Sequence, residues 1–260
     1  MPVSPVAVVT GASRGIGRRL AIDLAADGYD VVCTARSSDA HPGRLTGTVD
    51  ETAAAVRAAG RRAMPVALDM QDEAGIARLA DRVFAEWGRC DLLIANAAVA
   101  PPRPALQDTT KRWRLAVDVN VNGPFYCCYY FCPRMAAGDG GRVITVSSGA
   151  AVTPSFGRAS YTATKLALEG MSQALAHDLA GSVAVNCIRI DLPIWTEGFD
   201  ATLPDDFDTS GFEDAAVMTD AVRWLVAQER SYTGHVITLG ELRSRGVVRP
   251  PTRAERGRGS

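Results

Sequence analysis

The chain has 260 residues, of which 47% are hydrophobic, and its formal net charge is −1. This length suits one large α/β domain, and the hydrophobic fraction is sufficient for an extensive core. The near-neutral charge provides no overall attraction to nucleic acid or to an anionic membrane, so neither is an expected partner.

Short runs of β-branched residues alternate along the chain with longer segments rich in alanine and leucine. The predicted elements are, in chain order, strand 6–10, helix 16–27, strand 30–35, helix 49–59, strand 63–68, helix 72–87, strand 92–95, helices 110–119 and 124–137, strand 142–146, helix 161–179, strand 183–190, helix 212–228 and strand 235–239. Glycines follow several of these helices, as C-terminal capping favours.

The β-α-β-α order predicts a doubly wound parallel sheet, or Rossmann fold, of about seven strands with helices on both faces. Functional residues are then expected at the carboxyl ends of the strands. We expect one domain over residues 1–243. The remaining residues, 244–260, are basic and contain Pro250 and Pro251. Their composition predicts a flexible tail.

Six cysteines and three histidines show no paired spacing typical of a metal site, so we expect no metal and a set of buried, reduced thiols. The first residues lack the basic and apolar segments of a secretory signal. No run approaches the ~20 apolar residues of a membrane helix. These features predict a cytoplasmic protein.

The sequence TGASRGIG at 10–17 joins the first predicted strand to the first helix. Glycine at 11 permits a tight turn, and glycines at 15 and 17 allow close approach of a pyrophosphate and of the neighbouring strand. The free N–H groups of a helix N-terminus favour such an anion. An ordinary strand–helix turn is the alternative for the glycine pattern alone. The predicted cofactor-binding residues of this loop are Gly11, Ser13, Arg14, Gly15, Ile16 and Gly17.

Arginines occur where a dinucleotide fold that prefers NAD(H) usually has a carboxylate for the ribose 2′-hydroxyl. Arg14 lies within the glycine loop, and Arg36 follows the second strand. Because arginine forms bidentate, charge-assisted hydrogen bonds with phosphate, NADP(H) is the predicted cofactor and NAD(H) the less favoured one. The alternative is that both arginines are simply solvated.

Tyr161 and Lys165 are four residues apart at the start of a predicted helix and therefore lie on one face. A tyrosine pKa of about 10 is too high for an efficient base near neutrality, and a nearby ammonium would favour the phenolate. Two exposed helix residues are the alternative. Ser148, 13 residues before Tyr161, ends the fifth strand. Asn120 lies in a helical region, where a helix break near Gly123 is the alternative explanation.

Together these motifs resemble the short-chain dehydrogenase/reductase family, in its common single-domain form, from about Val6 to Gly240. The matching pieces are TGASRGIG, Asp69 after the third strand, Asn96-Ala97-Ala98 after the fourth, Asn120 in NVNG, Ser148 and YTATK at 161–165. The segments around 41–70 and 109–125 are similar to the branch containing hydroxysteroid-dehydrogenase-like proteins.

The resemblance implies roles for four catalytic residues. Tyr161 would be the general acid in carbonyl reduction and the base in alcohol oxidation. Lys165 would hold the nicotinamide ribose hydroxyls and lower the Tyr161 pKa. Ser148 would hydrogen-bond the substrate oxygen. Asn120 would position a water behind Lys165 for proton relay.

The resemblance also implies contacts along the cofactor. Asp69 would meet the adenine amino group, with the Met70 backbone beside it. The segment Asn96-Ala97-Ala98 would line the cofactor, with Asn96 also holding the central strand. Ile194 and Thr196 would contact the nicotinamide carboxamide, although the segment RIDLPIWT at 189–196 departs from the family's usual Pro-Gly pattern.

Two points remain open within that departing region. Arg189 and Asp191 would pair with each other, the interpretation we favour, or one of them would meet a polar substrate. The loop at about 192–214 carries aromatic residues that would either line an apolar pocket or anchor a lid, namely Trp195, Phe199, Phe207 and Phe212.

The predicted function is therefore that of an NADP(H)-dependent oxidoreductase. It would interconvert a secondary alcohol and a ketone, or an alcohol and an aldehyde, on a small and fairly apolar molecule. The alternative is a non-catalytic, cofactor-binding regulatory or scaffold member of the same family. Such proteins usually form dimers or tetramers through two long helices, here near 105–138 and 161–180, so we expect a homodimer or homotetramer.

Overall fold

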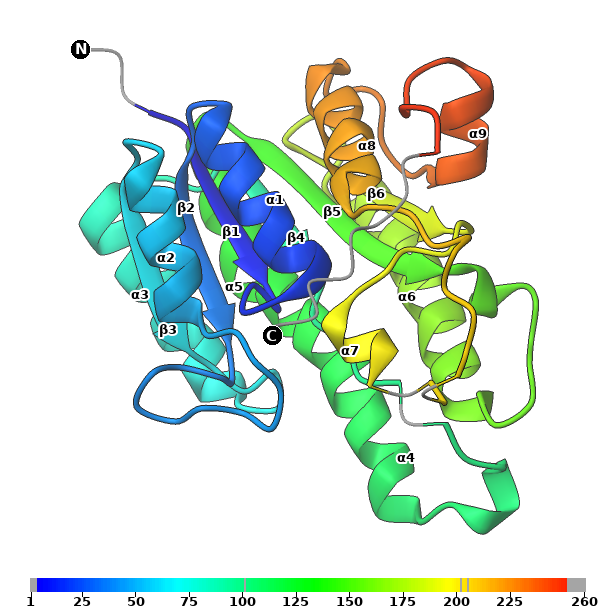
Figure 1. The fold of residues 1–260 in the computed structure, drawn as a ribbon. Coiled ribbons are helices and arrows are strands. Elements are labelled where there is room, and N and C mark those ends of the chain that lie inside the picture. Colours follow the sequence, from blue (N-terminus) through cyan, green and yellow to red (C-terminus); the bar gives the residue numbers. More distant parts are fainter. Residues whose placement is uncertain (1–3, 101, 202, 205, 252–260) are drawn as a thin grey trace.

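A parallel seven-stranded sheet forms the centre of the computed structural model, which describes residues 4–100, 102–201, 203–204 and 206–251 (Figure 1). The strand order is β3-β2-β1-β4-β5-β6-β7, and each neighbouring pair is parallel. The strands are β1 Val6–Thr10, β2 Asp30–Ala35, β3 Ala63–Ala67, β4 Leu92–Ala95, β5 Gly141–Ser148, β6 Val183–Ile190 and β7 Val236–Thr238. The predicted fold class is confirmed.

Helices cover both faces of this sheet because successive strand residues point to opposite sides. Ala7 and Val9 of β1 pack in one apolar cluster, and Val6 and Val8 pack in another on the opposite face. Three helices lie on the first face: α1 Gly15–Ala26, α2 Val49–Ala58 and α8 Ala216–Ala227. The second face is covered by α3 Glu73–Trp87, α5 Gly123–Ala137 and α6 Ala159–Asp178.

The helical region before β5 is continuous rather than broken. Helix α4 Thr110–Val117 passes through a π-helical turn, Asp118–Asn122, directly into α5. A Cβ added at Gly123 would lie 2.8 Å from the Met70 carbonyl oxygen, so this glycine serves a close packing contact and does not end the helix. Asn120 lies in the π-helical turn, a type of distortion that is frequent at functional sites.

Helix α8 begins at Ala216, four residues later than predicted. The Asp214 carboxylate accepts a hydrogen bond from the Ala216 N–H at 2.7 Å, and this local contact marks the helix start. The preceding Glu213 is buried and forms an isolated bridge to Ile194. Residues 212–215 are therefore the anchored end of a loop, which contains the short helix α7 Glu197–Asp200.

The prediction of a flexible tail from Ser244 is wrong for residues 247–249. After β7 the chain forms a helix that was not predicted, α9 Leu239–Ser244. Val248 is then buried in the cluster of the first face, and Arg249 forms an ion pair with Asp220 at 2.6 Å. Apolar burial therefore outweighs the basic composition. The rest of the predicted tail, residues 252–260, lies outside the described residues.

The thiol prediction is confirmed, because all six cysteines are free and buried. Burial raises the pKa of Cys33 and of Cys127 to about 12. In the part of the chain that the structure describes, no helix is long and apolar enough to cross a membrane. The same residues contain no group of three or more His, Cys, Asp or Glu arranged to hold a metal ion.

Candidate active site

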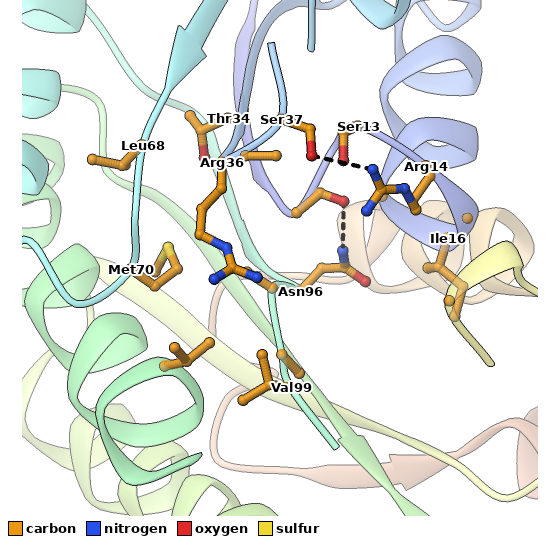
Figure 2. A pocket seen from close by; sticks show the side chains of 18 of the residues that line it. Ser13, Arg14, Ile16, Thr34, Arg36, Ser37, Leu68, Met70, Asn96 and Val99 are labelled. Atoms are coloured by element: carbon orange, nitrogen blue, oxygen red, sulfur yellow. Dashed lines mark hydrogen bonds between the residues drawn. The ribbon is translucent and has the colours of Figure 1, made fainter. Parts of the chain in front are cut away.

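A cleft opens at the carboxyl ends of the strands where the strand order reverses, between β1 with β2 on one side and β4 on the other (Figure 2). Such a reversal point is where doubly wound sheets bind ligands. Thirteen of the predicted residues line the cleft, namely Gly11, Ser13, Arg14, Gly15, Ile16, Gly17, Arg36, Asp69, Met70, Asn96, Ala97, Ala98 and Thr196.

Seven lining residues were not predicted: Thr34, Ala35, Ser37, Leu68, Val99, Val119 and Gly198. Most of them directly flank a predicted strand end or a predicted site residue. Extending each motif by one residue in either direction would have found five of the seven, whereas Thr34 and Gly198 lie two residues from Arg36 and Thr196.

Glycines form a cradle at the base of the cleft. Gly11 has φ +69°, and a Cβ there would lie 2.9 Å from the Ala97 Cα. A Cβ on Gly17 would lie 2.2 Å from the Gly11 carbonyl oxygen. Both positions therefore require glycine, and the backbone is left open to a large anionic ligand. The chemistry of the cradle fits the pyrophosphate of a dinucleotide.

Asn96 ties two central strands together. Its Nδ2 donates to the Thr10 carbonyl oxygen at 2.9 Å, and its backbone N–H donates to Thr10 Oγ1 at 3.0 Å. Thr10 Oγ1 also accepts from the Ala97 N–H and donates to the Ile94 carbonyl oxygen. The Asn96 amide thus holds β4 against the end of β1, as the resemblance implied.

The two candidate cations differ in their surroundings. Arg14 donates from Nε to the Thr46 carbonyl oxygen at 2.8 Å, and its Nη2 contacts Ser37 Oγ and the carbonyl oxygens of Leu45 and Gly47. Its guanidinium therefore joins the glycine loop to residues 45–47. Arg36 has no hydrogen bond or salt bridge to the described residues, and Figure 2 shows it extending across the cleft between Met70 and Asn96.

Asp69 stands at the end of the cleft that follows β3. Its Oδ1 accepts from the Gln71 backbone N–H at 3.0 Å, and the Gln71 side-chain amide lies 3.3 Å from both carboxylate oxygens. Met70 beside it is buried against Gly123. Asp69 is therefore oriented by the following turn and still borders the cleft.

Tyr161 and Lys165 share one face of α6, as the spacing predicted. The Lys165 Nζ lies 5.6 Å from the centroid of the Tyr161 ring. Lys165 is only 2% exposed, and its Nζ donates to the Val146 carbonyl oxygen at 2.6 Å. Among the described residues this is its one hydrogen bond, which leaves two N–H groups of the ammonium for other acceptors. Neither residue belongs to the lining of the dinucleotide cleft itself.

Ser148 and Asn120 lie on elements that pack against α6, and their side chains differ in how many hydrogen bonds they make within the described residues. Ser148 is the last residue of β5, and its Oγ accepts from the Ala150 N–H at 3.2 Å, so its hydroxyl proton remains available. Asn120 is buried. Its amide exchanges two bonds with the Val99 backbone at 2.8 and 2.9 Å and also donates to Thr164 Oγ1 at 3.1 Å. The Asn120 side chain therefore joins the π-helical turn, the β4 loop and α6.

The predicted ion pair between Arg189 and Asp191 is wrong. Arg189 instead makes a bidentate contact with Glu169, at 2.9 Å from Nε and 2.7 Å from Nη2. The Asp191 carboxylate accepts from the Gly240 N–H at 3.0 Å. Asp191 follows the end of β6 and is held by the Gly240 N–H, whereas α6 packs directly against β6 and brings the Glu169 carboxylate to Arg189.

Glu169 is a buried carboxylate that sequence reasoning missed. Ser147 Oγ donates to it at 2.7 Å, in addition to Arg189. Burial by itself raises the pKa of Glu169, but the Arg189 and Ser147 hydrogen bonds and the charges of Arg189 and Lys165 lower it below its ordinary value. Its position four residues after Lys165, on the same face of α6, was the available signal.

The loop after β6 contains Ile194 and Thr196, the two residues predicted to contact the nicotinamide carboxamide, and only one of them borders the cleft. Thr196 lines the cleft and caps α7 by accepting from the Phe199 N–H at 3.1 Å. The Ile194 side chain is buried in the apolar cluster of the first face and does not line the cleft. Phe199 stacks on Phe212 with ring centroids 5.5 Å apart, and Phe207 meets Phe212 edge-on. These contacts favour the lid-anchoring role of the aromatic residues.

The family model described as short chain dehydrogenase matches residues 5–192. Hydroxysteroid dehydrogenase-like protein 2 of Danio rerio is 30% identical over 243 residues, which make up 92% of this chain and 58% of that protein. The chain thus spans a little more than half the length of this relative.

Two solved structures illustrate the likeness of fold. A short chain dehydrogenase from Mycobacterium paratuberculosis, bound to NAD, is 29% identical with a TM-score of 0.80 over 91% of this chain and 96% of that one. A metagenomic short-chain oxidoreductase in complex with NADP is 30% identical with a TM-score of 0.76, again over 91% and 96% of the two chains.

Proposed function

Because this chain belongs to the short chain dehydrogenase family, we propose that it is an NADP(H)-dependent oxidoreductase with Tyr161 as its general acid and base. Its substrate is a small, fairly apolar molecule carrying a secondary alcohol or ketone, or an alcohol or aldehyde. The observation that carries the proposal is the buried Lys165 ammonium, 5.6 Å from the centroid of the Tyr161 ring.

The proton chemistry belongs to the residues at the end of β5 and the start of α6. A bound nicotinamide supplies or accepts the hydride. In reduction, the Tyr161 hydroxyl gives its proton to the substrate carbonyl oxygen, and the Ser148 hydroxyl stabilises the negative charge that develops there. In oxidation, the Tyr161 phenolate takes the alcohol proton.

Lys165 and Asn120 hold this arrangement. One Lys165 N–H binds the Val146 carbonyl oxygen, which fixes the ammonium beside the tyrosine, and two remain for the ribose hydroxyls of the cofactor. Both N–H groups of the Asn120 amide are used within the fold. A water behind Lys165 would therefore be held by the Asn120 backbone, and the side chain would stabilise the π-helical turn.

The NADP(H) preference rests on Arg36. Its side chain borders the cleft without a partner among the described residues, and the end of β2 has no carboxylate. Arg14, in contrast, is engaged with residues 45–47. A 2′-phosphate would be bound bidentately by the Arg36 guanidinium. Asp69 and the Asn96-Ala97-Ala98 segment then line the adenosine half, and Thr196 lies toward the nicotinamide half.

The alternative of a non-catalytic family member depended on the charged residues Arg189 and Asp191. Both are engaged inside the fold, with Glu169 and Gly240 respectively, so neither favours a changed role for the site. The two functions are distinguished by incubating the protein with NADPH and a panel of ketones and aldehydes. Loss of NADPH absorbance at 340 nm supports the enzyme, and binding without turnover of any carbonyl supports the alternative.

We also propose a homo-oligomer built on α4, α5 and α6. Large apolar side chains on these helices remain exposed, including Trp113 at 46%, Tyr129 at 60% and Leu166 at 54%. Large apolar side chains that are exposed on these helices favour a protein–protein contact there. A homodimer or homotetramer would cover it.

A further inference from the structure

A carboxylate from the loop after β6 rests on the glycine loop. The Gly15 backbone N–H, at the first residue of α1, donates to Glu197 Oε2 at 2.9 Å. Glu197 is 182 residues away in sequence and is the first residue of α7. No part of the proposed reaction requires a carboxylate at this place.

The start of α1 attracts an anion that its own sequence does not provide. The first turn of α1 contains no acidic residue, and Arg14 at the N-cap provides no side-chain hydrogen bond. The free N–H groups and the helix dipole therefore favour an external anion. In this structure the Glu197 carboxylate occupies that position.

Helix α7 also fits closely against the loop. A Cβ built on Gly15 would lie 3.1 Å from both Cβ and Cγ2 of Thr196 and 3.6 Å from Glu197 Oε2. Thr196 and Glu197 therefore cover the same glycine that is expected to lie against the pyrophosphate. A carboxylate and a pyrophosphate would also repel each other there.

We propose that Glu197 occupies the pyrophosphate position in the cofactor-free protein, and that the dinucleotide binds only by displacing it. Glu197 is thus a determinant of cofactor affinity, and its displacement moves α7 at the edge of the cleft. This inference rests on the proposed function only in that a dinucleotide binds in the cleft.

The anchoring of the loop confines that movement to the α7 region. Before α7, the Trp195 N–H donates to the Glu213 carbonyl oxygen at 3.0 Å, and the Glu213 N–H donates to the Pro193 carbonyl oxygen at 2.8 Å. The Glu213 carboxylate is in turn paired with Arg243. Because both ends of the loop are held, release of Glu197 shifts Thr196 and α7 without unfolding residues 193–195 or 213.

The test measures the dissociation constants of NADP⁺ and NADPH by calorimetry for the wild type, Glu197→Gln and Glu197→Ala. A carboxylate at a helix N-terminus contributes about 0.3–1 kcal/mol, and up to about 2 in partly buried cases. At 1.4 kcal/mol per factor of ten, these contributions correspond to about two- to fivefold and at most about thirtyfold, so we expect about two- to thirtyfold tighter binding by Glu197→Ala. Glu197→Gln retains an acceptor oxygen but loses the charge, so its gain is smaller.

Glu229→Gln is the matched control because it removes one exposed carboxylate just after α8. The carbonyl oxygen of Gln228, the residue before it, accepts a hydrogen bond from Arg142 at the start of β5, so Glu229 lies at the amino ends of the strands, opposite the cleft. The affinity of Glu229→Gln for the cofactor should equal that of the wild type. A second readout is hydrogen exchange of residues 196–201 without cofactor, which should be faster in Glu197→Ala because α7 has lost its contact.

The outcomes separate the inference from the proposed function. If the wild type binds NADP(H) and Glu197→Ala binds equally or more weakly, Glu197 does not compete with the pyrophosphate and the inference is overturned. Unchanged hydrogen exchange in Glu197→Ala would overturn it as well. If neither the wild type nor any variant binds a nicotinamide dinucleotide, the proposed function itself fails.

Discussion

The buried ion pair between Glu169 and Arg189 allows a prediction whose size follows from its geometry. Two parallel hydrogen bonds join the groups at 2.9 and 2.7 Å, and Ser147 adds a third to the carboxylate. The Glu169 side chain is 6% exposed and that of Arg189 is 21% exposed. Glu169→Gln keeps the shape but removes the negative charge, which leaves the guanidinium without its counter-ion.

Removing one partner of a buried ion pair costs about 3–5 kcal/mol. The partial exposure of Arg189 lets water hydrate the guanidinium, so we expect a loss nearer 2–3 kcal/mol for Glu169→Gln. For a chain of this size, 1 kcal/mol changes the melting temperature by about 2–4 °C, which predicts a decrease of about 5–10 °C. The double variant Glu169→Gln/Arg189→Met removes both charges and should recover much of this loss.

Urea unfolding followed by circular dichroism measures these differences. The pKa of Glu169 lies below its ordinary value, so its stabilisation is complete above the unfolded pKa of about 4.3 and is lost as the pH falls through the folded pKa. The difference in the free energy of unfolding between the wild type and Glu169→Gln should therefore become smaller below about pH 4. A single variant as stable as the wild type at pH 7, or a double variant as unstable as the single one, would refute the reasoning.

Three further predictions concern the cleft and the outer helices. Arg36→Asp should weaken NADP(H) binding about 10- to 100-fold and NAD(H) binding much less, because hydrogen bonds to charged groups contribute about 1.5–3 kcal/mol. If the ratio of the two dissociation constants is unchanged, Arg36 does not determine the preference for NADP(H) over NAD(H). Gly17→Ala should destabilise the protein by about 1–3 kcal/mol in thermal unfolding through its clash with the Gly11 carbonyl oxygen, whereas Gly170→Ala, with open space around it, should not. Tyr129→Glu should convert the oligomer to monomer in light scattering, and an unchanged mass would place the interface elsewhere.

The sequence was sufficient for the parts of the site that topology brings together. Strand ends meet at one edge of a parallel sheet, so the sequence alone predicts that the glycine loop, Arg36, Asp69 and the Asn96 segment surround one cleft. The spacing of Tyr161 and Lys165 likewise fixed their common face, because a helix repeats every 3.6 residues. The glycine loop, Arg36 and the common face of Tyr161 and Lys165 needed only periodicity and connection rules, whereas Asp69 and the Asn96 segment were placed by the resemblance to the family.

Side-chain partners could not be predicted in the same way. Arg189 finds Glu169, and Gly15 finds Glu197, through packing between elements that are far apart in sequence. Periodicity gives the direction of a side chain but not the group that it meets. The buried Val248 shows the same limit, since its place in the core depends on a turn after α9 that the basic composition of the tail concealed.

The central claim is most directly tested by Tyr161→Phe, compared with wild type in one experiment. NADPH binding is measured by calorimetry, and NADPH consumption is measured with a carbonyl substrate that the wild type reduces. We expect the variant to fold and to bind NADPH like the wild type, while its turnover falls by about 100-fold or more, because general acid catalysis contributes a factor of about 10²–10⁴. Turnover equal to that of the wild type would contradict the assignment of Tyr161.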